Sequence, residues 1–214
     1  KGEGEEEKGG DREKGQTKQV KCGENDKKKG EESEERARIE GDERKEEDMN
    51  EKLITAINNQ VTNEHQAAMI YTQLGYEMDD LSFPGMRDWF MAQAEEEREH
   101  AQKFADHLLA RGYRVELGDI TMPSLKAATP LDAFEASYAH EQKVSEDIRE
   151  IVRIADEVQD LDSRSILNWF MNEQIEEEDT VSEIIDQIKL VGNDGAGLLR
   201  IDRGLSSRQP AIDA

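Results

Sequence analysis

The chain has 214 residues, of which 51 are acidic and 28 basic, so its formal net charge is −23 at pH 7. A protein this acidic repels the phosphate backbone, so nucleic-acid binding is not expected, whereas cations are attracted. The sequence contains no apolar stretch long enough to cross a bilayer, so we expect no association with a membrane.

Residues 1–48 form a segment of distinct composition. They include 18 acidic and 13 basic residues but no Phe, Tyr or Trp. Such a segment cannot bury enough apolar surface to offset the entropy of ordering, so we predict a disordered, charged low-complexity tail. Cys22, the only cysteine, lies in it. The rest of the chain therefore has no disulfide and no thiolate ligand, which fits a reducing compartment, and we expect a cytoplasmic protein.

Met49 directly precedes the first patterned segment. The preceding residues, 45–48, can be back-translated to a purine-rich ribosome-binding sequence. We therefore hypothesise that Met49 is the true start and that residues 1–48 are a translated, non-native leader. The alternative is a genuine charged tail. The nucleotide sequence distinguishes them, because codons without an AAGGAG-like run would contradict the leader.

From Glu51 onward apolar residues recur with helical spacing, and helix-breaking residues fall between the periodic segments. Ser82 and Thr129 are the expected N-caps of the second and third helices, and Gly112 and Gly192 end the second and fourth. Each main helix is about 40 Å long at 1.5 Å per residue. The predicted helices cover about 51–79, 84–111, 130–159, 162–191 and 195–206.

The connections define the fold class. Short links join the first helix to the second and the third to the fourth, so each pair forms an antiparallel hairpin, whereas residues 112–129 can cross the length of the bundle. We predict an all-α four-helix bundle with one long crossover and a short fifth C-terminal helix. This domain spans 49–208, and 209–214 form a C-terminal tail.

The inner face of each main helix is apolar at its ends and polar near its middle when read as a heptad pattern. Helices of similar length pack side by side, so these polar residues are expected to converge inside the bundle. Isolated ionised carboxylates there are costly, and bound cations explain the cluster better. The converging residues are Glu64, Glu97, His100, Glu141, Gln174 and Glu177.

Carboxylates with one imidazole suit iron or manganese, and zinc less selectively. Glu97 and His100, at positions i and i+3, lie on one helix face and can reach the same metal. Two adjacent metals bridged by a carboxylate use this number of ligands well, as in the known di-iron carboxylate sites of helix bundles. The pattern therefore favours a di-metal centre.

At these residues the chain resembles a known family, the bacterial non-haem ferritins, which belong to the ferritin-like di-iron proteins. The similarity covers about residues 49–208. The terminal segment DGAGLLRIDRGLSSR (194–208) is similar to the short fifth helix of that family. The segments similar to its four main helices are NEHQAAMIY (63–71), AEEEREH (94–100), YAHEQ (138–142) and NWFMNEQIEEE (168–178).

The resemblance implies three iron sites. The first corresponds to Glu64, Glu97 and His100. The second corresponds to Glu97 as a bridge, Glu141 and Glu177, with Gln174 beside the metals. A third, more peripheral site corresponds to Glu96, Glu173 and Glu176, together with Glu177.

The resemblance also assigns catalytic roles around a di-iron centre. Tyr71 matches a tyrosine near that centre, Trp169 matches a nearby tryptophan, and no haem is expected. Relatives with a second Glu-x-x-His motif on the fourth helix differ, because the corresponding pair here is Gln174 and Glu177. The catalytic residues implied are Glu64, Glu97, His100, Glu141 and Tyr71.

The function implied by the resemblance is iron storage and detoxification. A ferroxidase of this type oxidises Fe(II) to Fe(III) with dioxygen or hydrogen peroxide and stores the product as a ferric mineral. Storage requires a cage, and the resemblance implies self-assembly into a hollow 24-subunit shell. Two alternatives remain open, a non-catalytic iron buffer or carrier and a di-metal oxygenase.

Overall fold

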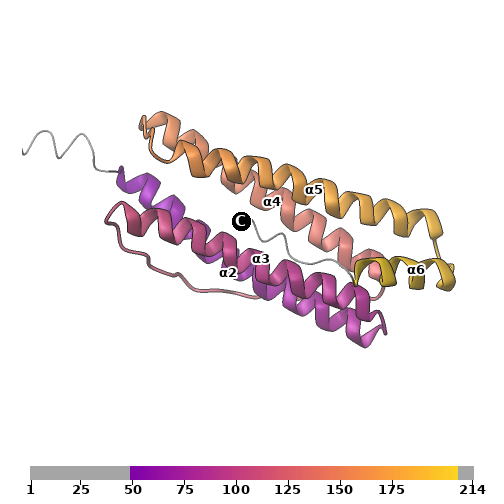
Figure 1. Ribbon diagram of the computed structural model, residues 1–214. Coiled ribbons are helices and arrows are strands. Elements are labelled where there is room, and N and C mark those ends of the chain that lie inside the picture. Colours follow the sequence, from indigo (N-terminus) through magenta and orange to yellow (C-terminus); the bar gives the residue numbers. More distant parts are fainter. Residues whose placement is uncertain (1–48, 207–214) are drawn as a thin grey trace, which may run out of the picture. The chain divides into compact units, whose positions relative to one another are not determined.

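The computed structural model of the protein describes residues 49–206. The tail predicted over 1–48 and the C-terminal segment 209–214 lie outside the described residues. Within the described part all regular structure is helical, as predicted (Figure 1). The helices are α2 (Glu51–Asp80), α3 (Pro84–Ala110), α4 (Pro130–Glu157), α5 (Arg164–Val191) and α6 (Gly195–Leu205).

The helices form the predicted bundle with one crossover. α2 pairs with α3 and α4 pairs with α5, while α2 also packs against α4. The connection from α3 to α4 runs along the outside of the bundle, and α6 packs against α3 and α5 at one end (Figure 1). No helix between residues 49 and 206 is long and apolar enough to cross a membrane.

Most helix ends follow the predicted signals, and one does not. The Thr129 side chain accepts a hydrogen bond from the Asp132 backbone N–H at 3.2 Å, and Gly192 ends α5 with a φ of 57°. Ser82 was predicted as the N-cap of α3, but this is wrong, because the cap residue is Phe83. The turn is so short that Ser82 reverses the chain with a φ of 64°. Pro84 then opens the helix, where its missing N–H leaves no donor unsatisfied.

A polar stripe on α2 holds the crossover in place. Asn58, Thr62 and Gln66 are spaced four residues apart, so they lie on one face of the helix. They bond to the backbone of residues 116–121 at distances of 2.9, 3.0 and 2.6 Å. The crossover thus satisfies its backbone groups against α2 rather than in a sheet.

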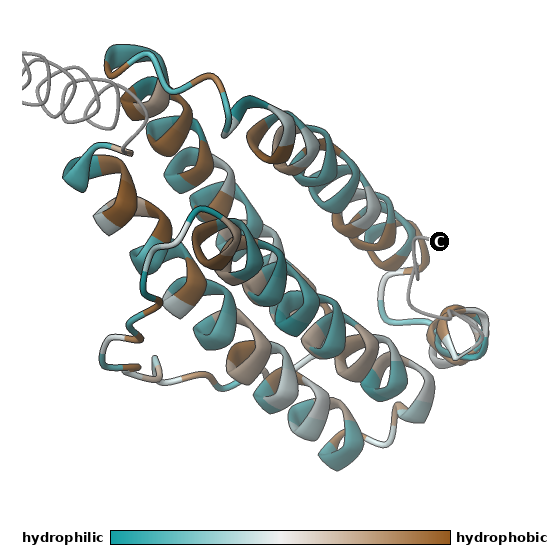
Figure 2. Cartoon of the chain, turned by 60° about the vertical axis from the view of Figure 1, so that its left-hand side comes forward, coloured by the Kyte–Doolittle hydropathy of each residue, from teal (hydrophilic) through white to brown (hydrophobic). Residues whose placement is uncertain are grey.

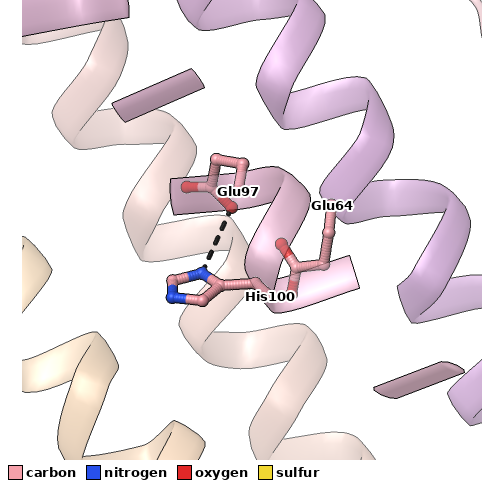
Figure 3. Close-up of side chains that lie close together, drawn as sticks. All are labelled: Glu64, Glu97 and His100. Atoms are coloured by element: carbon pink, nitrogen blue, oxygen red, sulfur yellow. Dashed lines mark ion pairs between the residues drawn. The ribbon is translucent and has the colours of Figure 1, made fainter. Parts of the chain in front are cut away.

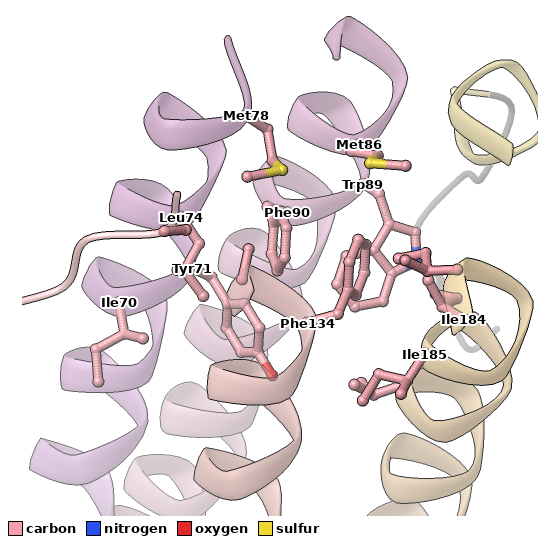
Figure 4. Packing of buried hydrophobic residues seen from close by; sticks show 14 of the residues in the cluster. Ile70, Tyr71, Leu74, Met78, Met86, Trp89, Phe90, Phe134, Ile184 and Ile185 are labelled. Carbon is pink, nitrogen blue, oxygen red and sulfur yellow. The ribbon is translucent and has the colours of Figure 1, made fainter. Parts of the chain in front are cut away.

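The apolar core of the bundle is divided into two clusters, and hydrophobic and hydrophilic residues alternate along each main helix (Figure 2). In the first cluster Tyr71, Trp89, Phe90 and Phe134 pack together beside aliphatic residues of α5 (Figure 4). The second cluster lies at the other end of the same helices. It includes Leu53, Ile57, Val61, Phe104, Leu108, Ile148, Ile151, Leu167 and Phe170.

The two clusters leave a gap in the same part of every main helix. On α2 the second cluster ends at Val61 and the first begins at Ile70. On α5 the corresponding limits are Phe170 and Val181. The buried side chains between these limits are mostly polar, apart from Ala67 and Ala68 on α2, so the fold brackets a polar layer with apolar packing on both sides.

α6 is fixed to the start of α3 through Asp202. This carboxylate is buried and accepts a hydrogen bond from the Met86 backbone N–H at 2.8 Å. It therefore replaces the cap that Phe83 cannot supply. Gly85 permits the close approach, because a Cβ at that position would lie 1.8 Å from the Asp202 carbonyl oxygen.

We predict that Asp202→Ala destabilises the protein by about 0.5–2 kcal/mol, the cost of a lost helix cap. The thermal midpoint should fall, and the Met86 amide should exchange faster with deuterium. Asp202→Asn is the matched control, because its side-chain oxygen can still accept the hydrogen bond. Equal exchange rates in all three proteins would contradict this account of how α6 is held.

Candidate metal centre

The polar layer at the centre of the bundle is made by side chains from all four main helices. Their exposed fractions lie between 0% and 4%, so they are removed from bulk water. Each main helix contributes at least one carboxylate, and α3 also contributes an imidazole. The residues of this layer are Glu64 on α2, Glu97 and His100 on α3, Glu141 on α4, and Gln174 and Glu177 on α5.

Glu64, Glu97 and His100 form one compact group of potential ligands (Figure 3). One ligand atom from each lies within 4.8 Å of the others. The His100 Nδ1 atom is 3.5 Å from Glu97 Oε2, because residues three apart on α3 face the same way. Glu64 reaches the pair from α2, so two helices define this group.

Glu141, on α4, contacts side chains from both α2 and α5. Its Oε2 atom accepts a hydrogen bond from the Gln174 amide at 3.1 Å. The Tyr71 hydroxyl donates to Glu141 Oε1, and Ser137 Oγ donates to the Tyr71 oxygen at 3.1 Å. Tyr71 therefore connects the polar layer to the aromatic packing of the first core cluster.

A second group of potential ligands lies at the α3–α5 interface. It consists of Glu96, Glu173 and Glu177, whose nearest ligand atoms also lie within 4.8 Å of one another. Glu96 and Glu177 are buried and Glu173 is partly exposed. Glu176, which the resemblance assigns to this site, is exposed and lies outside the group.

Aromatic rings pack against the imidazole of His100 on one side of the layer. The imidazole lies edge-on to Trp169 and Phe170, with ring centroids 5.6 and 5.5 Å away. Phe170 in turn stacks on Phe104 at 3.9 Å. The Lys103 ammonium lies 4.5 Å above the Trp169 ring. These contacts fix the orientation of the imidazole and limit access of water from this side.

Comparison with known proteins gives a consistent result. The ferritin-like domain family matches residues 54–191. The bacterial non-heme ferritin of Staphylococcus haemolyticus (strain JCSC1435) is 33% identical over 156 residues, which is 73% of this chain and 94% of that protein. The chain belongs to the ferritin family. This confirms the resemblance found in the sequence, and it supports iron storage as the function.

Other ferritins are similar over the same part of the chain. The bacterial non-heme ferritin of Staphylococcus aureus (strain USA300) is 31% identical over 160 residues, covering 75% of this chain and 96% of that protein. An open pore ferritin from Archaeoglobus fulgidus, solved by crystallography, is 35% identical with a TM-score of 0.74. It covers 75% of this chain and 98% of its own. The ferritin-like four-helix bundle is thereby confirmed.

The electrostatics of the ferritin layer favour protonated carboxyls when no cation is bound. Burial raises the pKa of Glu64 well above its ordinary value of 4.5, and the charge of Glu97 raises it further. Burial also raises the pKa of Glu97, followed by the charges of Glu141 and Glu177. Glu97 is thus repelled by the charges of Glu141 and Glu177. A cation placed between them would remove the repulsion.

Two carboxylate oxygens in the layer have no hydrogen-bond donor in the described part of the chain. Glu64 Oε2 and Glu97 Oε2 are buried and receive no hydrogen bond within residues 49–206, although Glu97 Oε2 lies 3.5 Å from His100 Nδ1. Buried polar atoms are nearly always paired, so these oxygens indicate a missing partner. Oxygen donors with one imidazole are a suitable set for iron. The residues present therefore fit an iron cation.

Two buried residues beside the layer were not assigned from the sequence, Gln60 and Gln93. Both side chains are buried, with exposed fractions of 1% and 0%. Gln60 donates to Glu64 Oε1 at 2.9 Å, and Gln93 donates to Glu177 Oε2 at 3.0 Å. The available signal was their position, since each stands four residues before a glutamate of the first group.

The raised pKa values predict how stability changes with pH in the metal-free protein. The folded state holds protons on Glu64 and Glu97 at pH values where the unfolded chain has released them. Their contribution to the free energy of unfolding is therefore fully present below the unfolded pKa of about 4.5. It declines as the pH rises towards the raised pKa of the folded state. Each unit of pKa difference corresponds to about 1.4 kcal/mol.

We predict that Glu64→Gln raises the thermal midpoint of metal-free protein at pH 7.5 and has little effect near pH 4.5. The amide keeps the shape and still accepts the hydrogen bond from Gln60, but it carries no charge to desolvate. Thermal denaturation in the presence of a chelator measures the difference. An equal rise in the thermal midpoint at both pH values would contradict the claim that the buried charge of Glu64 destabilises the metal-free protein.

Proposed function

We propose that this ferritin is a ferroxidase, which oxidises Fe(II) to Fe(III) at the polar layer and stores the product as a ferric mineral. The observation that supports the proposal is the convergence of carboxylates from four helices, with one imidazole, at a single buried level. Membership of the ferritin family supports iron as the cation. The proposed ligands are Glu64, Glu97, His100, Glu141, Gln174 and Glu177.

In this proposal Glu97 bridges two iron ions. Its Oε2 atom lies 3.5 Å from His100 Nδ1 on one side, where Glu64 completes the first site. The charges of Glu141 and Glu177 raise the pKa of Glu97, which supports the proposal that these two carboxylates form the second site with it. A carboxylate shared by both sites is the natural bridge. Iron binding would displace the protons that the metal-free carboxyls hold.

The electron balance follows from the two ions. Each Fe(II) loses one electron, and the pair of electrons reduces dioxygen to hydrogen peroxide or hydrogen peroxide to water. Anionic carboxylates stabilise the more highly charged ferric ions, so the product is favoured at the site. Tyr71 donates a hydrogen bond to Glu141, and we propose that it can supply a third electron for reduction of dioxygen beyond peroxide while its hydroxyl proton passes to Glu141.

The second acidic group provides a route away from the centre. Glu177 belongs both to the polar layer and to the group with Glu96 and Glu173. We propose that a third iron site forms there, with Glu176 contributing from the exposed side of α5. Iron could then pass from the buried layer towards the surface by exchange between neighbouring carboxylates.

Storage as a mineral requires an enclosed volume, which a single bundle does not have. We propose that the chains assemble into a hollow 24-subunit cage, as the family resemblance implies. We further propose a cytoplasmic location, because Cys22 is the only cysteine in the chain. Size exclusion tests the assembly, since a monomer or dimer of the 24.3 kDa chain would count against storage.

We predict that added Fe(II) is oxidised rapidly in air by the protein and that Glu97→Ala or His100→Ala lowers the initial rate at least tenfold. Either change removes a direct ligand from the proposed centre. Stopped-flow absorbance of the ferric product measures the rate. Glu95→Gln is the matched control, because Glu95 is an exposed carboxylate on the same helix and pairs with Arg98.

The same experiment separates the ferroxidase from a passive iron binder. A binder would take up Fe(II) without accelerating its oxidation above that of iron in buffer. Oxidation that is equally fast in the Glu97, His100 and Glu95 variants would place the chemistry elsewhere. Either result would overturn the proposed ferroxidase activity. Iron uptake without faster oxidation would still be compatible with iron storage.

A further inference from the structure

Three buried glutamines make the same kind of contact in the polar layer. Gln60, Gln93 and Gln174 are each no more than 4% exposed. Each donates its amide N–H to one carboxylate of the layer, at 2.9, 3.0 and 3.1 Å respectively. The carboxylates that accept these bonds are Glu64, Glu177 and Glu141. Gln174 belongs to the centre proposed above, and the other two glutamines have no role in it so far.

The chemistry of the partners fixes the orientation of each amide. A carboxylate that binds a cation is ionised and only accepts hydrogen bonds, so in the cation-bound state the amide nitrogen must face it. In Glu64 the bond occupies Oε1, and Oε2 is buried. Gln60 therefore holds the Glu64 carboxylate through Oε1 and leaves Oε2 without a hydrogen bond in the described part of the chain.

Gln93 has a second feature that points to a ligand. It reaches from α3 to Glu177 on α5, and its own carbonyl oxygen, Oε1, is buried with no hydrogen-bond partner among residues 49–206. The side chain is 0% exposed, so bulk water does not satisfy this oxygen. A hydrated cation entering the layer beside Glu177 would bring the missing donor, because its bound water molecules donate hydrogen bonds.

We propose that Gln60 and Gln93 are positioning residues of the metal centre, each tuning a different cation site. Gln60 holds Glu64, and Gln93 holds Glu177 while its Oε1 accepts a hydrogen bond from the hydration shell of the entering divalent cation. Neutral donors steady the carboxylates without adding a positive charge that would repel the cation. This inference rests on the proposed function, because it requires that the layer binds divalent cations.

The same chain contains a matched pair outside the layer. Gln73 donates to Glu77 at 2.9 Å with the same four-residue spacing as Gln60 and Glu64. Gln73 and Glu77 line a surface hollow beneath the crossover, together with residues 122–128. A change at Gln73 thus removes an equivalent hydrogen bond on α2 without touching the proposed ligands.

The test uses zinc, which binds similar ligands but cannot be oxidised. Metal-free full-length protein and the variants Gln60→Met, Gln93→Met and Gln73→Met are titrated with Zn(II) against a chromophoric chelator. Methionine has a similar volume but neither donates nor accepts strong hydrogen bonds. Zinc-edge anomalous scattering from crystals soaked at limiting Zn(II) then reports the occupancy of each site.

We expect Gln60→Met to weaken zinc binding by about 10- to 100-fold at the site of Glu64, Glu97 and His100, as found for residues that orient metal ligands. Gln93→Met should weaken zinc binding to a similar degree at the site of Glu97, Glu141 and Glu177. Gln73→Met should leave zinc binding at both sites unchanged. Circular dichroism checks that all variants are folded, and the opposite site in each variant serves as an internal reference for a correctly formed bundle.

Two results would overturn the inference in distinguishable ways. If wild-type protein binds zinc in the layer and the Gln60 and Gln93 variants bind it equally well, the positioning roles are wrong while the proposed function stands. If wild-type protein binds no cation in the layer, both fail. An equal loss at both sites in both variants would also refute separate tuning of the two sites.

Discussion

The structure depends on the placement of several carboxylates in the centre of a protein core. Removing such groups from water and bringing them together is unfavourable, and the raised pKa values of Glu64 and Glu97 express that cost. The fold accommodates the layer by placing an apolar cluster at each end of the bundle. Those clusters supply the hydrophobic burial, and the layer between them carries the candidate metal ligands. The proposed cation binding would relieve the repulsion, so the same charges that weaken the metal-free protein would become the source of affinity.

The helices and the layer were predictable from the sequence because both follow from periodicity. Inward positions recur every three to four residues, so Glu64 and Glu141 could be placed inside the bundle without coordinates. The N-cap at Ser82 was predicted wrongly, since the conformation of a tight turn depends on how α2 and α3 meet. The roles of Gln60 and Gln93 were also not predicted. Periodicity places a side chain on a face, but it does not show which carboxylate on another helix the side chain will reach.

The parts of the chain around the layer contribute rigidity rather than ligands. The crossover is held along α2 by three polar residues, and α6 is held at the start of α3 by Asp202. These contacts lie at the outer surface and at one end of the bundle, so they can fix the helices without disturbing the buried carboxylates. Positions such as Gly85 matter because they allow backbones to approach closely. The proposed metal centre would need this support, because small shifts between the four helices would change the distances between its proposed ligands.

Anomalous scattering at the iron edge, from crystals soaked anaerobically with Fe(II), tests the central claim most directly. Our account predicts two strong peaks inside the polar layer, one bounded by Glu64, Glu97 and His100 and the other by Glu97, Glu141 and Glu177. A weaker peak beside Glu96 and Glu173 would correspond to the proposed third site. Iron bound only at surface carboxylates, with no density between the four helices, would contradict the assignment of the layer as the metal centre.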